Sequence, residues 1–197
     1  MFRRVLRVAV PLAVAAGLSV GSLALANEQE KSGPSHQQDQ RSNASKSGPD
    51  GVSAWDEQWL KMSIEGDRFE VIGGKIALQK SHNPAVIQLA SRLIADHSKS
   101  LQDAVTEAKE FGIEVPDTPS PSQQWALTVV STFSGNAFDH WYSDLEVNDH
   151  MQDIQETQDE IDKGSNPEIR QLAQDDLPVL KEHLKLAQQA LAASPLG

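Results

Sequence analysis

Cysteine is absent from this chain of 197 residues, so disulfide bonds and thiolate metal sites are both excluded. No serine lies in a nucleophile-elbow motif, and no glycine-rich loop of the kind that cradles phosphate occurs. The chain therefore lacks the usual signatures of nucleophilic hydrolysis and of phosphate binding. Any metal site must be built from histidine and carboxylate side chains.

Positive charge is also scarce. The chain has 17 lysine and arginine residues against 28 aspartate and glutamate residues, which gives a formal net charge of −11. Removal of residues 1–26, which contain three arginines and no acid, would leave a net charge of 14 − 28 = −14. Nucleic acid and anionic membranes attract positively charged surfaces, so neither is expected as a partner. An acidic surface is compatible with cation binding.

Only one long apolar run occurs, at residues 8–25, and it follows a short basic stretch with three arginines. The run closes with Ala24-Leu25-Ala26, a small-x-small pattern that signal peptidases cleave. This pattern predicts a signal peptide of residues 1–26 that is cleaved after Ala26. The mature protein is then expected in the periplasm or outside the cell, with no stable membrane insertion.

The rest of the chain divides by composition into a polar segment and an amphipathic one. Residues 27–52 are polar and charged, and cannot bury enough apolar area to offset their ordering entropy. They are predicted to be a disordered acidic and polar tether. In residues 53–194 apolar side chains recur at spacings of three and four, without the alternation of a β-strand. This segment is predicted to form one all-α domain.

Cap residues and prolines predict four long helices and one short helix. The second and fourth long helices begin at Asn83-Pro84 and Asn166-Pro167, with asparagine as the cap and proline in the first turn. A short helix over residues 123–133 is expected before the third long helix, which runs from about residue 137 to 163. The inward face expected for the first helix consists of Trp55, Trp59, Met62, Gly66, Phe69, Gly73 and Ile76.

The two long hairpins are similar in sequence. Residues 82–90 (HNPAVIQLA) and 165–173 (SNPEIRQLA) share Asn, Pro, Gln, Leu and Ala in register. This similarity indicates an internal duplication of a helical hairpin. Two such hairpins are expected to pack as a four-helix bundle.

Four polar side chains are expected near mid-height in this bundle. Glu70 and His97 are equally far, within one residue, from the first hairpin turn, and His150 and His183 are equally far from the second. Each residue adds ~1.5 Å along a helix, so antiparallel neighbours at equal distance from a shared turn lie at one height. The two pairs are expected to be offset by roughly one helical turn.

Two further carboxylates are candidates for the same volume. Glu146 belongs to the polar row of His150, and Asp176 belongs to the inward row of His183. Three imidazoles together with two or three carboxylates suit a transition metal such as iron, zinc, manganese or copper.

The alternative is a polar core without a ligand. In that case Glu70 pairs with His97, and the other inward histidines form ordinary hydrogen bonds. The acidic row at the end of the third long helix, which includes Glu160, is expected to face solvent.

Four segments of the chain carry a family resemblance: residues 66–71 (GDRFEV), 90–99 (ASRLIADHSK), 134–139 (SGNAFD) and 177–184 (LPVLKEHL). Through them the chain, over residues 55–193, resembles the bacterial exported family known as domain of unknown function 4142, which is placed among ferritin-like bundles. The resemblance implies a ferritin-like four-helix fold and an exported location, and it supplies no activity. Glu70, His97, His150 and His183 fall on positions that the family pattern favours.

Three functions remain open at this point. The first is an exported metal-binding bundle for sequestration or stress protection. The second is a non-catalytic module that binds an envelope protein or a second copy of itself. The third is a di-metal oxidoreductase, which is the least favoured because the sequence has no Glu-x-x-His motif of the di-iron bundles.

Overall fold

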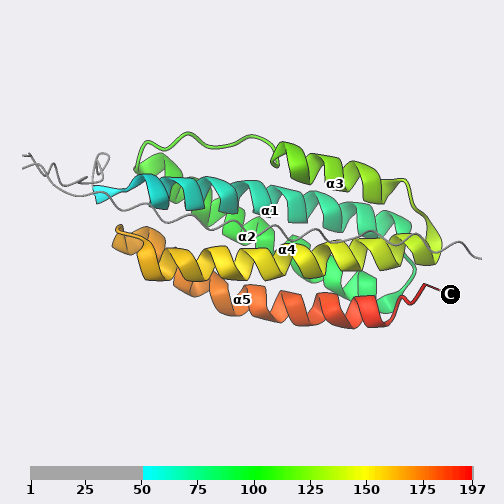
Figure 1. The fold of residues 1–197 in the computed structure, drawn as a ribbon. Helices are drawn as coiled ribbons and strands as arrows, with labels where there is room; N and C mark the ends of the chain where they lie inside the picture. The colour runs from blue at the N-terminus through cyan, green and yellow to red at the C-terminus, as the bar shows by residue number, and fades with distance from the viewer. Residues whose placement is uncertain (1–50, 197) are drawn as a thin grey trace, which may run out of the picture. The chain divides into compact units, whose positions relative to one another are not determined.

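The computed structural model describes residues 51–196, which form four long helices and one short helix (Figure 1). The helices are α1 (Ala54–Lys80), α2 (Pro84–Glu110), α3 (Pro121–Ser131), α4 (Gly135–Lys163) and α5 (Pro167–Ala192). The predicted signal peptide and nearly all of the predicted tether lie outside these residues. Within residues 51–196 no helix is both long and apolar enough to span a membrane.

The long helices pack as two antiparallel hairpins. α1 pairs with α2 and α4 pairs with α5, while α2 lies against α5 and α1 lies against α4. The short helix α3 lies over α1 and α4, on the outside of the bundle (Figure 1). The prediction of a four-helix bundle with a short helix before the third long helix is therefore confirmed.

Local capping explains where the helices begin. The side chains of Asn83 and Asn166 accept hydrogen bonds from backbone N–H groups in the first turns of α2 and α5, and each is followed by proline. The short helix begins at Pro121 rather than at residue 123, because Ser120 forms a capping box with Gln123. α4 begins two residues before the expected start, at Gly135, which adopts a φ of +57°.

Asp56 joins the start of α1 to the turn between α4 and α5. Its carboxylate accepts hydrogen bonds from the backbone N–H groups of Ser53, Ser165 and Asn166. Burial alone would raise the pKa of Asp56, but hydrogen bonds from Ser165, Ser53 and Asn166 outweigh it and hold the pKa well below its usual range. One ionised side chain thus links the two hairpins at this end of the bundle.

The core has two apolar layers with a polar layer between them. One apolar layer is formed by Ala77, Val86, Leu89, Ala90, Leu93, Val130, Phe138, Tyr142, Ala187 and Ala190. The other is formed by Val52, Trp59, Leu60, Ile64, Ala104, Ala108, Ile113, Ile169 and Ala173. On each long helix the buried histidines and glutamates near mid-length separate these two sets. The apolar layers shield the polar layer from water along the bundle axis.

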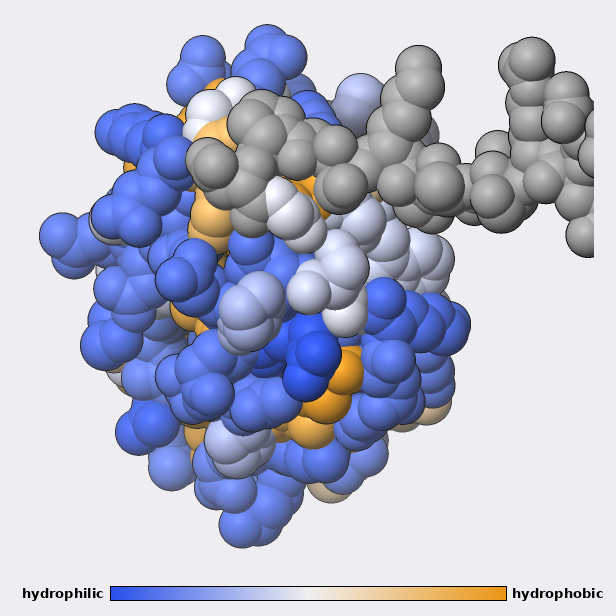
Figure 2. Space-filling model, turned by 90° about the vertical axis from the view of Figure 1, so that its left-hand side faces the viewer, coloured by the Kyte–Doolittle hydropathy of each residue, from blue (hydrophilic) through white to orange (hydrophobic). Residues whose placement is uncertain are grey.

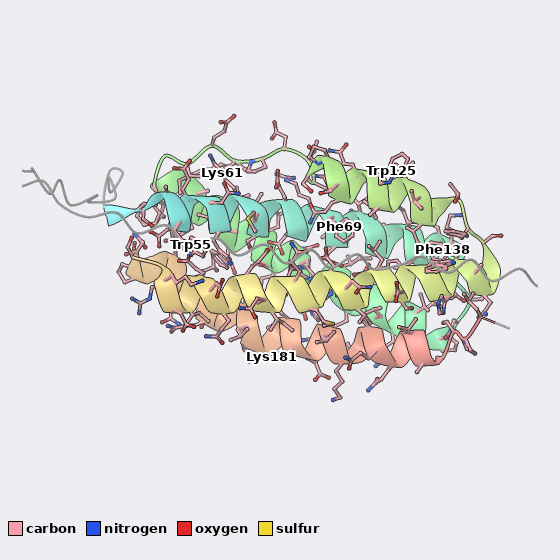
Figure 3. The ribbon with its side chains drawn as sticks, viewed as in Figure 1. Trp55, Lys61, Phe69, Trp125, Phe138 and Lys181 are labelled. Atoms are coloured by element: carbon pink, nitrogen blue, oxygen red, sulfur yellow. The ribbon has the colours of Figure 1, made fainter. Side chains whose placement is uncertain are left out.

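Two expectations about burial near the start of α1 were wrong. Trp55 is 45% exposed rather than inward, because Trp59, Leu60 and Ile64 cover the core side of the α1 start (Figure 3). Val52, assigned to the tether, is buried in the core.

Glu160, which was expected to face solvent, is fully buried. Burial, together with the nearby Asp56 carboxylate, raises the pKa of Glu160 to about 8. Its position follows from the close approach of the last turn of α4 to the start of α1.

Candidate metal centre

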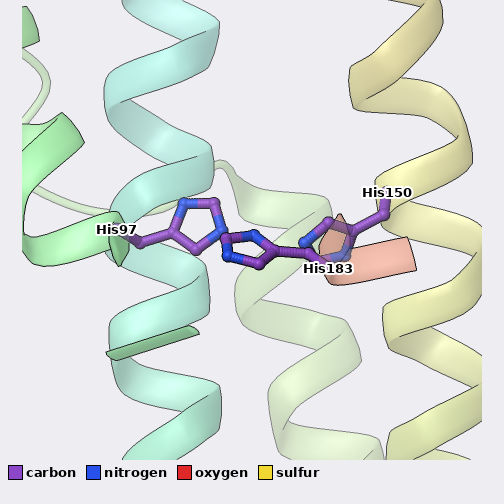
Figure 4. Close-up of side chains that lie close together, drawn as sticks. All are labelled: His97, His150 and His183. Atoms are coloured by element: carbon purple, nitrogen blue, oxygen red, sulfur yellow. The ribbon is translucent and has the colours of Figure 1, made fainter. Parts of the chain in front are cut away.

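Three histidines from three helices meet in the middle of the bundle. His97 of α2, His150 of α4 and His183 of α5 point toward one another (Figure 4). The ring centroids of His97 and His183 are 5.0 Å apart, those of His150 and His183 5.3 Å, and those of His97 and His150 5.8 Å. The exposed fractions are 5%, 0% and 1% for His97, His150 and His183. The cluster is therefore withdrawn from solvent.

Two of the rings are held by carboxylates. Nδ1 of His97 lies 2.7 Å from Oδ1 of Asp67, and Nε2 of His183 lies 2.8 Å from Oδ2 of Asp96. When both carboxyl groups are ionised they only accept hydrogen bonds, and the imidazole N–H is then the donor in each pair. Asp96 is the neighbour of His97 on α2, and the 100° rotation between successive residues directs it toward α5.

The third ring is held by the backbone. Nδ1 of His150 donates to the carbonyl oxygen of Glu146, 2.8 Å away. The remaining nitrogens are Nε2 of His97, Nε2 of His150 and Nδ1 of His183, which are buried and have no hydrogen-bond partner within residues 51–196. One ring nitrogen from each histidine lies within 4.8 Å of one from each of the others. Each of the three rings therefore has one unpartnered nitrogen, and the rings lie close enough together for one metal ion to contact all three.

Burial controls the charge of this cluster. It disfavours the imidazolium form, which lowers the pKa of His97 to about 4, of His150 to about 3 and of His183 to about 4. Mutual repulsion among the rings lowers the values for His150 and His183 further. All three histidines are thus neutral at pH 7, which is the form that binds metal ions.

The pair of His97 and Asp67 is sensitive to a nearby cation. Burial raises the pKa of the Asp67 carboxyl well above its usual range, and the Asp103 carboxylate raises it further. A cation on the far nitrogen of His97 would offset both effects and keep Asp67 ionised.

A pair of buried glutamates lies beside His150. Glu70 and Glu146 are both fully buried, and neither carboxyl has a hydrogen-bond partner in the described part of the chain. One oxygen of each lies 3.9 Å from Nδ1 of His150. Burial raises the pKa of Glu146 to about 8, and the Asp149 carboxylate contributes to the increase. Burial and the Glu146 carboxylate likewise raise the pKa of Glu70 well above its usual range.

The structure brings five of the six predicted candidates together. His97, His150 and His183 form one cluster, in a single layer, and Glu70 and Glu146 flank it. Asp176 lies apart, in a pocket that opens beside His183.

The structure does not pair Glu70 with His97 in the way that the alternative of a polar core without a ligand supposed. His97 instead bonds Asp67, which lies three residues before Glu70 on α1. Asp67 and Asp96 were not among the predicted site residues. The sequence signal for Asp96 was its position next to His97, but which helix it faces depends on packing.

Comparison with known proteins identifies a family and nothing beyond it. The model of the family described as domain of unknown function (DUF4142) matches residues 41–190, which is most of the chain. Neither the comparison with curated proteins nor the comparison with solved structures gave a match. With a four-helix bundle and a match over most of its length, the chain belongs to the DUF4142 family.

Proposed function

We propose that this protein is an exported metal-binding bundle that holds one transition-metal ion among His97, His150 and His183. Its role is sequestration of the metal or protection against metal stress. The observation that carries the proposal is the close approach of three buried histidine rings, each of which has one ring nitrogen without a hydrogen-bond partner among the described residues. Export is proposed from the signal-peptide pattern of residues 1–26.

The hydrogen bonds behind the rings support metal binding. Metal-ligating histidines almost always donate their second N–H to a carboxylate or a backbone carbonyl, which fixes the tautomer and the ring orientation. His97 and His183 bond carboxylates, and His150 bonds a carbonyl. Each ring therefore presents its free nitrogen to the centre.

A polar core without a bound metal explains the unpartnered polar atoms of these residues less well. Buried polar atoms in native proteins nearly always have hydrogen-bond partners. Here three histidine nitrogens and all four carboxyl oxygens of Glu70 and Glu146 lack one. A bound cation would satisfy the nitrogens and would favour the ionised forms of the two carboxyl groups.

The donor set restricts the metal. Imidazole suits zinc, copper and iron, whereas manganese prefers oxygen ligands. In a tetrahedral site with Zn–N bonds of ~2.0–2.1 Å, ligand nitrogens lie about 3.3 Å apart. The ring nitrogens lie within 4.8 Å of one another and would have to approach by up to about 1.5 Å. Three protein ligands leave a fourth position for water or for a glutamate oxygen.

Elemental analysis of the tag-free protein, purified from the exported fraction, tests the proposal. We expect close to one equivalent of zinc, copper or iron, and a tetrahedral Co²⁺ spectrum after reconstitution. His97→Gln and His183→Gln should abolish both signals. His82→Gln is the matched control, because His82 is exposed in the turn between α1 and α2. A protein that carries no metal and takes up no Co²⁺ would refute the proposal.

A further inference from the structure

A pocket of about 270 Å³ opens beside the histidine cluster, between the long helices. Its wall includes His97 and His183 and seven carboxylates, among them Asp67, Asp153 and Asp176. The volume is several times the ~30 Å³ that one water molecule occupies, so a cation fits with part of its hydration shell. Another pocket in the described region, beside α3, is lined by none of the three histidines.

The inner wall of this pocket carries buried atoms without partners. Asp67 is 4% exposed and uses one carboxyl oxygen, Oδ1, for His97, while its other oxygen, Oδ2, has no partner. Nε2 of His97 and Nδ1 of His183 are also unpartnered. The carboxyl group of Asp67 thus lines the pocket and also forms a hydrogen bond with His97 of the proposed metal centre.

Few positively charged side chains lie near the acidic groups of the pocket. Among the described residues that line it, Lys99 is the only lysine or arginine, and this lysine is largely exposed and forms an ion pair with Asp103. Arg92 pairs with Asp96 from outside the pocket wall. Burial and the neighbouring carboxylates raise the pKa of Asp153 well above its usual range and the pKa of Asp176 to about 7, so a cation bound between these groups favours their ionised forms. A recess lined mainly by acidic groups, between low-dielectric walls, concentrates counter-ions and increases their association rate by 10- to 10³-fold.

We propose that this acidic pocket is the capture site and access route through which a hydrated divalent cation reaches the three histidines. The inference rests on the proposed function, since it assumes that the histidines bind a metal. Asp153 of α4 and Asp176 of α5 hold the cation through its water molecules at the outer wall. The cation then exchanges water for the free imidazole nitrogens, while Asp67 remains bonded to His97. Asp176, a candidate ligand on sequence grounds, is thereby assigned to capture and not to the final coordination sphere.

Stopped-flow measurement of Co²⁺ uptake by the full mature chain tests this assignment. At low ionic strength we expect the double variant Asp153→Asn/Asp176→Asn to take up Co²⁺ at least ~10-fold more slowly than the wild type. Its uptake rate should also depend less on salt. The stoichiometry and the final Co²⁺ spectrum should match those of the wild type, since the histidines are unchanged. Circular dichroism establishes that the variant is folded.

Glu110→Gln is the matched control, because it removes one negative charge from an exposed position on α2 outside the pocket. Its uptake rate should stay within about twofold of the wild-type rate. Uptake by the double variant at the wild-type rate would overturn the capture role, and so would a changed final spectrum, which would make an aspartate a direct ligand. A wild-type protein that takes up no Co²⁺ would refute the proposed function and this inference together.

Discussion

Burial keeps the imidazoles of His97, His150 and His183 neutral, and each ring has one nitrogen engaged by an acceptor. The free nitrogens are pre-oriented, so a metal would not need to displace protons at neutral pH. The affinity of the site then depends strongly on the groups that hold the rings. Of the two carboxylates that hold these rings, Asp67 is more buried than Asp96.

Replacing Asp67 tests this dependence. Asp67→Asn retains an acceptor oxygen for His97 but removes the charge that makes the imidazole more basic, so we expect metal affinity to fall by about 10- to 100-fold. Competition with a chromophoric chelator measures the affinity. Asp103→Asn is the control, because Asp103 lines the same pocket but bonds no histidine. Equal affinities for the two variants would contradict the role of Asp67.

The raised pKa of Glu146 predicts how stability depends on pH in the metal-free protein. A carboxyl with a folded pKa of about 8 and an ordinary value of 4.5 holds its proton more tightly when folded, so stability falls as pH rises between these values. The lowered histidine pKa values act oppositely, since stability rises with pH from about 4 to 6.5. Above pH 6.5 the histidine contribution is constant, and the decline should become visible.

Glu146→Gln tests this sign. Glutamine is permanently neutral, so between pH 6.5 and 8 the variant should lose about 1–2 kcal/mol less stability than the wild type. Chemical unfolding at the two pH values, in the presence of a chelator, measures the difference. Glu114→Gln, at an exposed position, should behave as the wild type. A variant with the full wild-type decline would show that Glu146 is already ionised at pH 6.5.

Among the helices, α1 and α2 approach each other closely at Gly74, where there is no room for a side chain. A Cβ added at Gly74 would lie 2.8 Å from Cγ1 of Ile94 and 3.0 Å from the backbone oxygen of Ala90. Glycine costs about 1 kcal/mol of helix propensity relative to alanine. The position is therefore one at which packing between helices outweighs local preference.

We expect Gly74→Ala to destabilise the protein by about 1–3 kcal/mol, because the two helices must separate to admit the methyl group. Gly66→Ala is the comparison on the same helix. A Cβ at Gly66 would have its nearest neighbours at 4.0 Å, so this variant should be as stable as the wild type or up to ~1 kcal/mol more stable. Thermal unfolding followed by circular dichroism measures both, and the reverse order would contradict the packing argument.

Helix ends were predictable because their causes are local. The Asn-Pro pairs at residues 83 and 166 place a cap and a proline at the start of α2 and α5, whatever the rest of the chain does. The exposure of Trp55 was not predictable in this way. Three apolar residues near the start of α1 compete for the inward face, and only packing against α2 and α5 decides among them.

In the whole molecule, the histidine cluster joins the two hairpins. His97 comes from the first hairpin, and His150 and His183 come from the second. A metal bound by all three would bridge the hairpins midway between the apolar layers. The end of the bundle at which α1 begins is mostly hydrophilic on the face seen in Figure 2, so the apolar layers are largely covered there.

A metal that binds only the folded bundle should stabilise it. At a Zn²⁺ concentration 100-fold above the dissociation constant, linkage predicts about 2.7 kcal/mol of added stability. Calorimetry with Zn²⁺ and with EDTA should show an increase in Tm for the wild type and for His82→Gln, and none for His97→Gln. An identical Zn²⁺ response of all three proteins would place the binding elsewhere in the chain.

The acidic lining of the pocket beside the histidine cluster could not be predicted from the net charge of the chain. The net charge of −11 was compatible with cation binding, but equally with a solvated surface. Only the fold places Asp153 and Asp176, from different helices, around one recess that adjoins His183. The same fold buries Glu160, which the sequence pattern assigned to the solvated face.

By itself, the sequence determined the five helices, their turns and the family, because periodicity, caps and motifs act over a few residues. It also placed four of the polar residues near mid-bundle by counting residues from each turn. The tertiary structure decided the partners: His97 with Asp67, and His183 with Asp96. Those contacts depend on how each helix is rotated about its axis and on how the hairpins pack. No spacing within one helix contains that information.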